Sequence, residues 1–417
     1  MRIKRDRYLN KALSKRGNGL VKVVTGMRRC GKSFLLFDLF KTRLLEEGVA
    51  PDHIIELAFD SFENKRYRDP NVVFPYLLSK LSDEGQYYAL LDEVQLLAEF
   101  EDVLNSLIRR RNVDVYVTGS NARFLSRDVI TEFRGRGDEI PMRPLSFAEF
   151  MSVYPGSRQD GWNEYLLYGG LPFVLSIPNP DQKVQFLKSI FEETYISDIV
   201  GRHNVRNRAE LEELIDVLSS AVGSLTNPEK LAATFHSVKR KKISATTLRR
   251  YIGYLRDSFL IDGARRYDVK RKRYIDTPIK YYFTDLGLRN ARLNFRQVEP
   301  THIMENAIYN ELKTRGYNVD VGVVEQNAIN EKGNGAKKQL EIDFVCNLGS
   351  KRIYIQSAYS IDDPDKRERE IRPLALTGDF FKRILVTKDA PAPQYDEKGI
   401  LVVGLLDFLL DPKALDF

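Results

Sequence analysis

The stretch GLVKVVTGMRRCGKSFLLFDLF, residues 19–40, decides the fold. Residues 20–25 are a β-branched apolar run, which is typical of a buried strand. The pattern Gly-x-x-x-x-Gly-Lys-Ser follows from Gly26 to Ser33, and apolar residues at helical spacing come after it. A glycine-rich loop of this form between a strand and a helix is the context of a phosphate-binding loop. The sequence therefore predicts an α/β fold with a parallel sheet and a phosphate site after this strand.

The residues of this loop predict how a nucleotide is held. Backbone N–H groups would surround the phosphate chain, and the N-terminus of the following helix would add partial positive charge. Lys32 would contact the β- and γ-phosphates, and Ser33 would ligate Mg²⁺. The two arginines of the loop would either contact the nucleotide or pair with acids outside the loop. We expect ATP to contact Gly26, Met27, Arg28, Arg29, Cys30, Gly31, Lys32, Ser33 and Phe34.

A second apolar run, YYALLDEVQ at 87–95, ends in two acids. Asp92 would hold Mg²⁺ through water, and Glu93 would polarise the attacking water. Paired acids at this place favour hydrolysis of ATP over binding alone. We therefore expect Lys32, Asp92 and Glu93 to act in catalysis, and Ser33 and Asp92 to hold the metal.

A third run, VDVYVTGSN at 113–121, ends in Ser120 and Asn121. In P-loop ATPases a polar residue at this place lies between the acid and the γ-phosphate, so Asn121 is expected to help place water. A further buried strand is predicted at 53–60, and helical patterns separate the strands. This alternation predicts a βαβ series.

Five short motifs together carry a family resemblance. They are GMRRCGKS at 26–33, LLDEVQ at 90–95, TGSN at 118–121, GR at 135–136 and PLSFAEF at 144–150. In these motifs the chain resembles AAA+-related ATPases of archaea and bacteria that carry a DUF4143-type C-terminal region, from about residue 5 to the C-terminus. The resemblance implies ATP binding and hydrolysis. It also implies a helical lid and, after a winged helix, a restriction-endonuclease-like α/β domain.

Arg136, in the GR pair, is the candidate for stabilising charge on the γ-phosphate, in cis or from a neighbouring subunit. Arg134 is the second candidate, and a solvated basic loop is the alternative interpretation. AAA+ relatives commonly hydrolyse ATP at subunit interfaces, so the resemblance implies a homo-oligomer.

Residues 206–285 read as three helices followed by two strand-like runs, which is the order of a winged helix-turn-helix. Their basic side chains would neutralise phosphates from both sides if the third helix entered a DNA groove. A solvated face or an internal docking domain are the alternatives, so double-stranded DNA and a protein partner both remain open. The candidate DNA contacts are Lys239–Lys242, Arg249, Arg250 and Lys270–Arg273.

The stretch LEIDFVCNLGSKRIYIQSAYS, 340–360, resembles half of a nuclease site. In a restriction-endonuclease-like fold two acids hold Mg²⁺, and a lysine two residues after the second acid assists. Asp343 fits the first of these acids, and Glu305 fits a helix glutamate that often joins such a site, but the second strand reads Gln356-Ser357-Ala358 where acid-x-Lys would stand. We therefore predict that this domain does not cleave nucleic acid.

The whole chain of 417 residues is long enough for several domains, and its net charge of +7 permits an anionic partner. The two cysteines lie far apart in sequence, which excludes a disulfide framework and fits the reducing cytoplasm. No apolar run of about 18 residues and no apolar core of signal-peptide length is present, so no membrane partner is expected.

We expect an ATPase core at 1–155, a helical lid or linker at 156–205, a winged helix-turn-helix at 206–285 and the endonuclease-like domain at 286–417. The sequence predicts an Mg²⁺-dependent ATPase that couples turnover to a DNA-associated process. The alternative is an ATP-driven switch whose C-terminal domains dock a protein without binding DNA.

Overall fold

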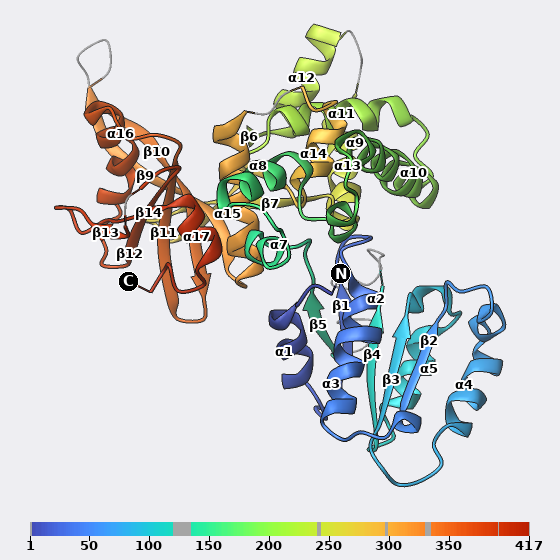
Figure 1. The fold of residues 1–417 in the computed structure, drawn as a ribbon. Helices are drawn as coiled ribbons and strands as arrows, with labels where there is room; N and C mark the ends of the chain where they lie inside the picture. Colours follow the sequence, from blue (N-terminus) through green and yellow to red (C-terminus); the bar gives the residue numbers. More distant parts are fainter. Residues whose placement is uncertain are drawn as a thin grey trace. The chain divides into compact units, whose positions relative to one another are not determined.

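The computed structural model describes residues 2–119, 135–239, 243–296, 299–329, 335–390 and 392–416 (Figure 1). The chain divides into two compact units. Unit 1 is Met1–Pro144 with Asp257–Phe259, and unit 2 is Leu145–Arg256 with Leu260–Phe417. The first four strands of unit 1 run in blue to teal in Figure 1, and the C-terminal strands of unit 2 in orange and red.

Unit 1 contains a five-stranded sheet in which every neighbouring pair is parallel. The strand order is β2-β3-β4-β1-β5, so the strand before the glycine-rich loop lies inside the sheet. The predicted parallel α/β sheet is thus confirmed. The strands are β1 (Val21–Thr25), β2 (Ile54–Ala58), β3 (Tyr87–Asp92), β4 (Val113–Thr118) and β5 (Gly137–Pro141).

Helices cover both faces of this sheet. On one face the core joins sheet residues such as Leu91 and Val117 to Val73 and Leu104 of two helices. On the other face Phe40 packs against Tyr116, with ring centroids 4.4 Å apart. The helices are α1 (Asp6–Ser14), α2 (Lys32–Phe34), which continues through a π-helical stretch (Leu35–Phe40) into α3 (Lys41–Glu46), α4 (Pro70–Ser79) and α5 (Phe100–Leu107).

Unit 2 begins with a run of helices. They are α7 (Phe147–Met151), α8 (Arg158–Tyr168), α9 (Pro180–Ser189) with a π-helical extension (Ile190–Ile196), α10 (Ser197–His203), α11 (Arg208–Ser220), α12 (Pro228–Lys239), α13 (Ala245–Asp257) and α14 (Leu286–Arg292). Asp285 caps α14 and also accepts a hydrogen bond from the Gly170 N–H at 2.8 Å. This contact ties the end of α8 to α14, so part of the segment expected as a lid packs within unit 2.

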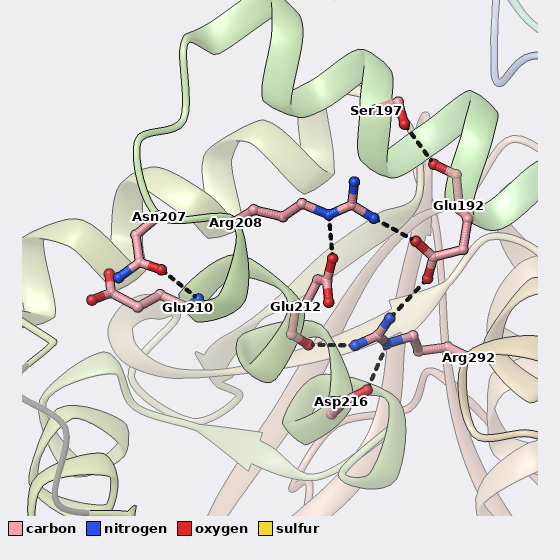
Figure 2. A network of polar contacts seen from close by, with 8 residues as sticks. All are labelled: Glu192, Ser197, Asn207, Arg208, Glu210, Glu212, Asp216 and Arg292. Atoms are coloured by element: carbon pink, nitrogen blue, oxygen red, sulfur yellow. Dashed lines mark hydrogen bonds and ion pairs between the residues drawn. The ribbon is translucent and has the colours of Figure 1, made fainter.

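An ion-pair network also joins these helices (Figure 2). The Arg292 guanidinium contacts Asp216 at 2.5 Å and Glu192 at 3.1 Å. Arg208 pairs with the same Glu192 and with Glu212. Both arginines therefore have carboxylate partners inside the helical part of unit 2.

The second sheet has nine strands in the order β13-β14-β12-β11-β10-β9-β7-β8-β6. Arg266–Asp268 of β7 pair in parallel with Val321–Val323 of β9. Strands on both sides of the expected boundary at residues 285 and 286 therefore belong to one sheet. The strands are β6 (Leu225–Thr226), β7 (Ile261–Asp268), β8 (Arg273–Phe283), β9 (Asn318–Ile329), β10 (Gly335–Leu348), β11 (Lys351–Ala358), β12 (Lys382–Thr387), β13 (Gln394–Tyr395) and β14 (Leu401–Gly404).

Three further helices accompany this sheet: α15 (Pro300–Thr314), α16 (Pro364–Ala375) and α17 (Leu405–Leu410). The α16 side of the sheet is filled by a core that includes Tyr354, Leu374 and Leu385. None of the helices in the described parts of the chain has the length and apolar character needed to cross a membrane.

Candidate nucleotide-binding site

The glycine-rich loop joins the buried strand β1 to α2, as the sequence predicts. Gly26 and Gly31 have φ values of 144° and 99°, in the region that favours glycine. A Cβ atom at Gly26 would also overlap the carbonyl oxygen of Met142, which follows β5. The loop backbone is therefore pressed against the chain after β5, and only glycine fits at position 26.

Lys32 stands at the first position of α2 and is 5% exposed. Its Nζ donates hydrogen bonds to the carbonyl oxygens of Gly26 and Met27, each at 3.0 Å. Both partners are neutral, so these contacts use two of the three N–H donors of the ammonium group without cancelling its charge. The charge remains available to an anion that enters the loop.

Asp92 ends β3 and is 4% exposed. Burial raises the pKa of its carboxyl group, and hydrogen bonds from Thr118 and Ser33 oppose that rise. The fold thus brings together the two predicted metal ligands, Ser33 from α2 and Asp92 from β3. A hydroxyl and a carboxylate are oxygen donors of the kind that Mg²⁺ prefers.

Thr118, at the end of β4, links the two acids at the end of β3, Asp92 and Glu93. Its hydroxyl donates to the Asp92 carboxylate and accepts from the backbone N–H of Glu93 at 3.1 Å. The sequence predicts a polar residue after β4, and the candidate there is Asn121. Ser120, Asn121 and Arg134 lie outside the described residues. The signal that could have found Thr118 is its position as the last residue of the strand beside β3.

Glu93 has a φ of 52°, which is uncommon for a residue with a side chain. Its carboxylate accepts a hydrogen bond from the Gln95 amide, two residues later. Strained backbone of this kind concentrates at functional sites. The turn and the Gln95 amide therefore give the Glu93 carboxylate a defined direction.

The other predicted loop contacts differ in exposure. Met27 and Cys30 are buried at 1% and 0% exposure, so their side chains pack inward and only their backbone can face a phosphate chain. Arg28 is half-buried, Arg29 is exposed, and Phe34 is exposed on the first turn of the helix.

Arg136 immediately precedes β5, and its carbonyl accepts from the Val21 N–H at 2.9 Å. In the parallel register Val21 faces Gly137, whereas Thr25, which leads into the loop, faces Pro141. Arg136 and the loop therefore lie at opposite ends of the strands, about 15 Å of chain apart. An arginine side chain does not span that length, so Arg136 does not reach the loop of its own chain.

A second buried lysine, Lys280, lies beside Glu305 and Asp343, the acids expected at a nuclease site. The Nζ of Lys280, on β8, lies 2.9 Å from Glu305, 2.7 Å from Glu341 and 3.4 Å from Asp343. Burial lowers the pKa of Lys280, but the three carboxylates outweigh it and raise the pKa above its ordinary value. Among the described residues no group of three or more His, Cys, Asp or Glu is arranged to hold a metal ion.

Gln356, which stands in place of the expected second acid, has hydrogen-bond partners for both ends of its side-chain amide. Its carbonyl oxygen accepts from the Asp343 N–H at 3.2 Å, and its amide donates to Glu370 at 3.2 Å. The second carboxylate oxygen of Asp343 accepts from the Ser357 N–H at 2.9 Å. Sequence reasoning missed Lys280 because 25 residues separate it from Glu305 and 63 from Asp343.

The candidate DNA contacts are only partly available. Arg249 on α13 pairs with Glu229, and Arg271 pairs with Glu325 at 3.1 Å and Asp268 at 3.6 Å. Lys272 and Arg273 are exposed at the turn between β7 and β8, and Arg250 is exposed on α13. Lys270 reaches a backbone carbonyl, and Lys239 ends α12. Residues 240–242 lie outside the described residues.

Comparison with known proteins adds domain and family information. Residues 18–151 match the model AAA_14, described as an AAA domain. Residues 159–299 match DUF8612, described as a domain of unknown function, instead of the expected DUF4143-type region.

The similar solved structures include Aeropyrum pernix ORC1 in complex with DNA, at 13% identity and a TM-score of 0.30, covering 70% of this chain and 93% of that chain. Drosophila ORC bound to AT-rich DNA and Cdc6 is 12% identical, with a TM-score of 0.25 and coverages of 70% and 91%.

Two relatives match in sequence over most of the chain. An uncharacterized protein of Methanocaldococcus jannaschii is 26% identical over 371 residues, which are 84% of this chain and 77% of that protein. An uncharacterized protein of Haemophilus influenzae is 32% identical over 414 residues, 98% of both chains. The chain therefore belongs to the same family as the Haemophilus influenzae protein, and its N-terminal part is an AAA-type P-loop domain.

Proposed function

We propose that this protein binds Mg·ATP at the glycine-rich loop and hydrolyses it. The observation that carries the proposal is the hydrogen bond from Ser33, which follows Lys32 in the helix after the loop, to Asp92 at the end of β3. Lys32 supplies a positive charge whose Nζ contacts two neutral backbone carbonyls, and Ser33 and Asp92 supply oxygen ligands. The AAA-domain match over the same residues supports this assignment.

Mg²⁺, when bound, would neutralise charge on the phosphate oxygens. The chain's own groups divide the remaining work. Lys32 exchanges the carbonyls of Gly26 and Met27 for phosphate oxygens, while Thr118 keeps the Asp92 carboxylate oriented. Glu93 then directs its carboxylate to the water that attacks the γ-phosphate. The Gln95 amide donates a hydrogen bond to the Glu93 side chain, and the Thr118 hydroxyl accepts one from the Glu93 backbone N–H.

ATP turnover tests this proposal directly. Glu93→Gln keeps the shape of the side chain but removes the carboxylate, so turnover should fall by about 100-fold or more while Mg·ATP still binds. Glu99→Gln makes the same change at an exposed position beyond the Val94–Leu96 turn and should leave turnover intact. Equal turnover in wild type and Glu93→Gln would reject the assigned role.

The position of Arg136 favours action on a neighbouring subunit. Since it cannot reach the loop of its own chain, a contact with the γ-phosphate requires a second copy. Arg136→Ala and Glu93→Gln proteins, each inactive by itself, should then regain turnover when mixed. A mixture that stays at the level of the separate variants would argue against an arginine supplied in trans.

We further propose that unit 2 couples ATP turnover to double-stranded DNA. The order α11-β6-α12-α13-β7-β8 is that of a winged helix, and the exposed Lys272 and Arg273 lie at the tip of its hairpin. Turnover measured with and without duplex DNA should differ. Replacing Lys272 and Arg273 by Gln should lower the salt slope of DNA binding by about 0.9 per lost phosphate contact. Arg372→Gln, at an exposed site on α16, is the matched control.

A protein-docking switch is the second candidate, and the ion pairs favour it. Arg249 and Arg271 already have carboxylate partners, which reduces the charge open to DNA phosphates. Turnover that ignores duplex DNA, together with no salt-dependent DNA binding, would select this second function. In either case we propose that the C-terminal part has a restriction-endonuclease-like helix and strand order but no nuclease activity, because Lys280 fills the centre of its acids.

A further inference from the structure

Arg5 lies ahead of the glycine-rich loop in sequence but contacts it in space. It directly precedes α1 and is 2% exposed. One guanidinium nitrogen donates to the carbonyl oxygen of Cys30, inside the loop, at 3.0 Å. Another donates to the carbonyl oxygen of Arg143, just after β5, at 2.6 Å. A buried arginine thus joins the first helix, the loop and the chain that supports the loop.

The Cys30 contact controls the direction of a loop N–H group. In a planar trans peptide the C=O of one residue and the N–H of the next point in opposite directions. Because Arg5 holds the Cys30 carbonyl, it also sets the N–H of Gly31 on the other side of the loop. Gly31 has a φ of 99° and directly precedes Lys32, so the N–H that Arg5 orients belongs to the residue next to the lysine of the loop.

The rest of the clamp gives Arg5 a rigid base. Its guanidinium lies 4.7 Å above the centroid of the Tyr8 ring, and the Tyr8 hydroxyl accepts from the Arg143 N–H at 3.2 Å. Arg143 is therefore held at both its N–H and its C=O by the start of α1. The neighbouring Met142 N–H donates to the Thr25 carbonyl at 2.7 Å, which secures the same segment to the end of β1.

We propose that Arg5 is a positioning residue for the phosphate chain of the nucleotide, acting through the Cys30–Gly31 peptide. This inference rests on the proposed ATP site. Loss of Arg5 leaves a buried carbonyl without its charged donor, and the peptide then turns to find another partner. The loop loses a fixed N–H donor, so Mg·ATP and Mg·ADP bind more weakly while the folded chain persists.

Calorimetric titration of the full chain with Mg·ATP and Mg·ADP tests the proposal, together with the KM and kcat of ATP turnover. Arg5→Ala should raise Kd and KM by about tenfold, which corresponds to about 1.4 kcal/mol, at unchanged binding stoichiometry. Arg5→Lys keeps one donor and should recover part of the affinity.

Two matched controls separate positioning from folding. Tyr8→Phe keeps the ring beneath Arg5 but removes the acceptor for Arg143, so it should lower the unfolding temperature while raising Kd less than Arg5→Ala does. Lys4→Ala removes an exposed positive charge one residue away and should change neither. A merely structural Arg5 would lower the stoichiometry and kcat of Arg5→Ala while leaving Kd and KM as in wild type.

Lys32→Ala distinguishes failure of this inference from failure of the ATP site. If wild type binds Mg·ATP, Lys32→Ala does not, and Arg5→Ala binds as wild type does, the role of Arg5 is rejected and the site stands. If wild type and Lys32→Ala are equally poor binders, the ATP site itself is rejected. Should Arg5→Ala fail to fold, a wild-type Kd in folded Arg5→Lys would overturn the proposal.

Discussion

Two lysines, one in each unit, are buried to the same degree but have opposite surroundings. Lys32 is 5% exposed, and its Nζ contacts two backbone carbonyls. Lys280 is 4% exposed, and its Nζ contacts three carboxylates. Residue type and burial are therefore alike, and only the charge of the partners differs.

This difference separates a lysine that can act from one that maintains structure. Carbonyl contacts of Lys32 can be exchanged for phosphate oxygens, which bind an ammonium more strongly because they are charged. Lys280 cannot leave, because three clustered carboxylates, two of them buried, would then repel one another without a counter-charge. A buried lysine thus indicates an anion site only when its own partners are neutral.

The largest expected effect is on Lys280. Lys280→Met removes the ammonium but keeps a long apolar side chain, and it leaves the carboxylates uncompensated. We expect the free energy of unfolding to fall by about 3–5 kcal/mol, as for other broken buried ion pairs. Chemical denaturation measures this change. Adding Glu305→Gln and Asp343→Asn should recover much of the lost stability. If Lys280→Met alone unfolds with the free energy of the wild type, the structural role of Lys280 is rejected.

Lys32→Ala should have the reverse profile. Hydrogen bonds to two neutral carbonyls are lost and no carboxylate loses a counter-charge, so the free energy of unfolding should fall by about 1–3 kcal/mol, less than in Lys280→Met. ATP turnover should fall by about 100-fold or more because charge on the transferred phosphate loses its partner. Parallel denaturation and turnover measurements check both halves. A large loss of stability with intact turnover would reverse the roles assigned to the two lysines.

Thr118→Val tests the support of the acids opposite Lys32. The change keeps the shape but removes the hydroxyl that serves Asp92 and Glu93, at a cost of about 1–3 kcal/mol. Turnover should fall by about tenfold. Thr25→Val is the matched control, since the Thr25 hydroxyl donates to Glu139 at 2.6 Å in the same sheet. Equal turnover in the two variants would deny Thr118 a specific role.

Glu305 gives the smallest effect, which depends on pH. Burial raises its pKa, with Asp343 adding to the rise and Lys280 opposing it. A raised carboxyl pKa stabilises the fold below the unfolded value of 4.5, and that stability is lost as pH rises through the folded value. Glu305→Gln should therefore flatten the decline of stability above pH 4.5. Chemical denaturation at a series of pH values measures this decline. If the free energy of unfolding falls with pH as steeply in Glu305→Gln as in wild type, the raised pKa of Glu305 is contradicted.

Local sequence patterns predicted the glycine-rich loop, its strand and helix, and the acid at the end of β3. Thr118, Arg5 and Lys280 escaped notice because each has its partner at least 25 positions away. Arg136 was selected on a motif, and only the register of β1 with β5 revealed its distance from the loop. The role of Asn121 and those of the other site residues stay predictions.

The sequence by itself determined the phosphate-binding loop, because Gly26, Gly31 and Lys32 lie within one short segment and local backbone geometry specifies their use. It also determined that the 356–358 stretch lacks the acid and lysine of a nuclease. The tertiary structure alone decided that Lys280 neutralises Glu305, Glu341 and Asp343 and that Arg5 holds the loop. Counter-charges and clamps depend on which distant residues meet, and that is set by strand pairing and packing rather than by neighbours in the chain.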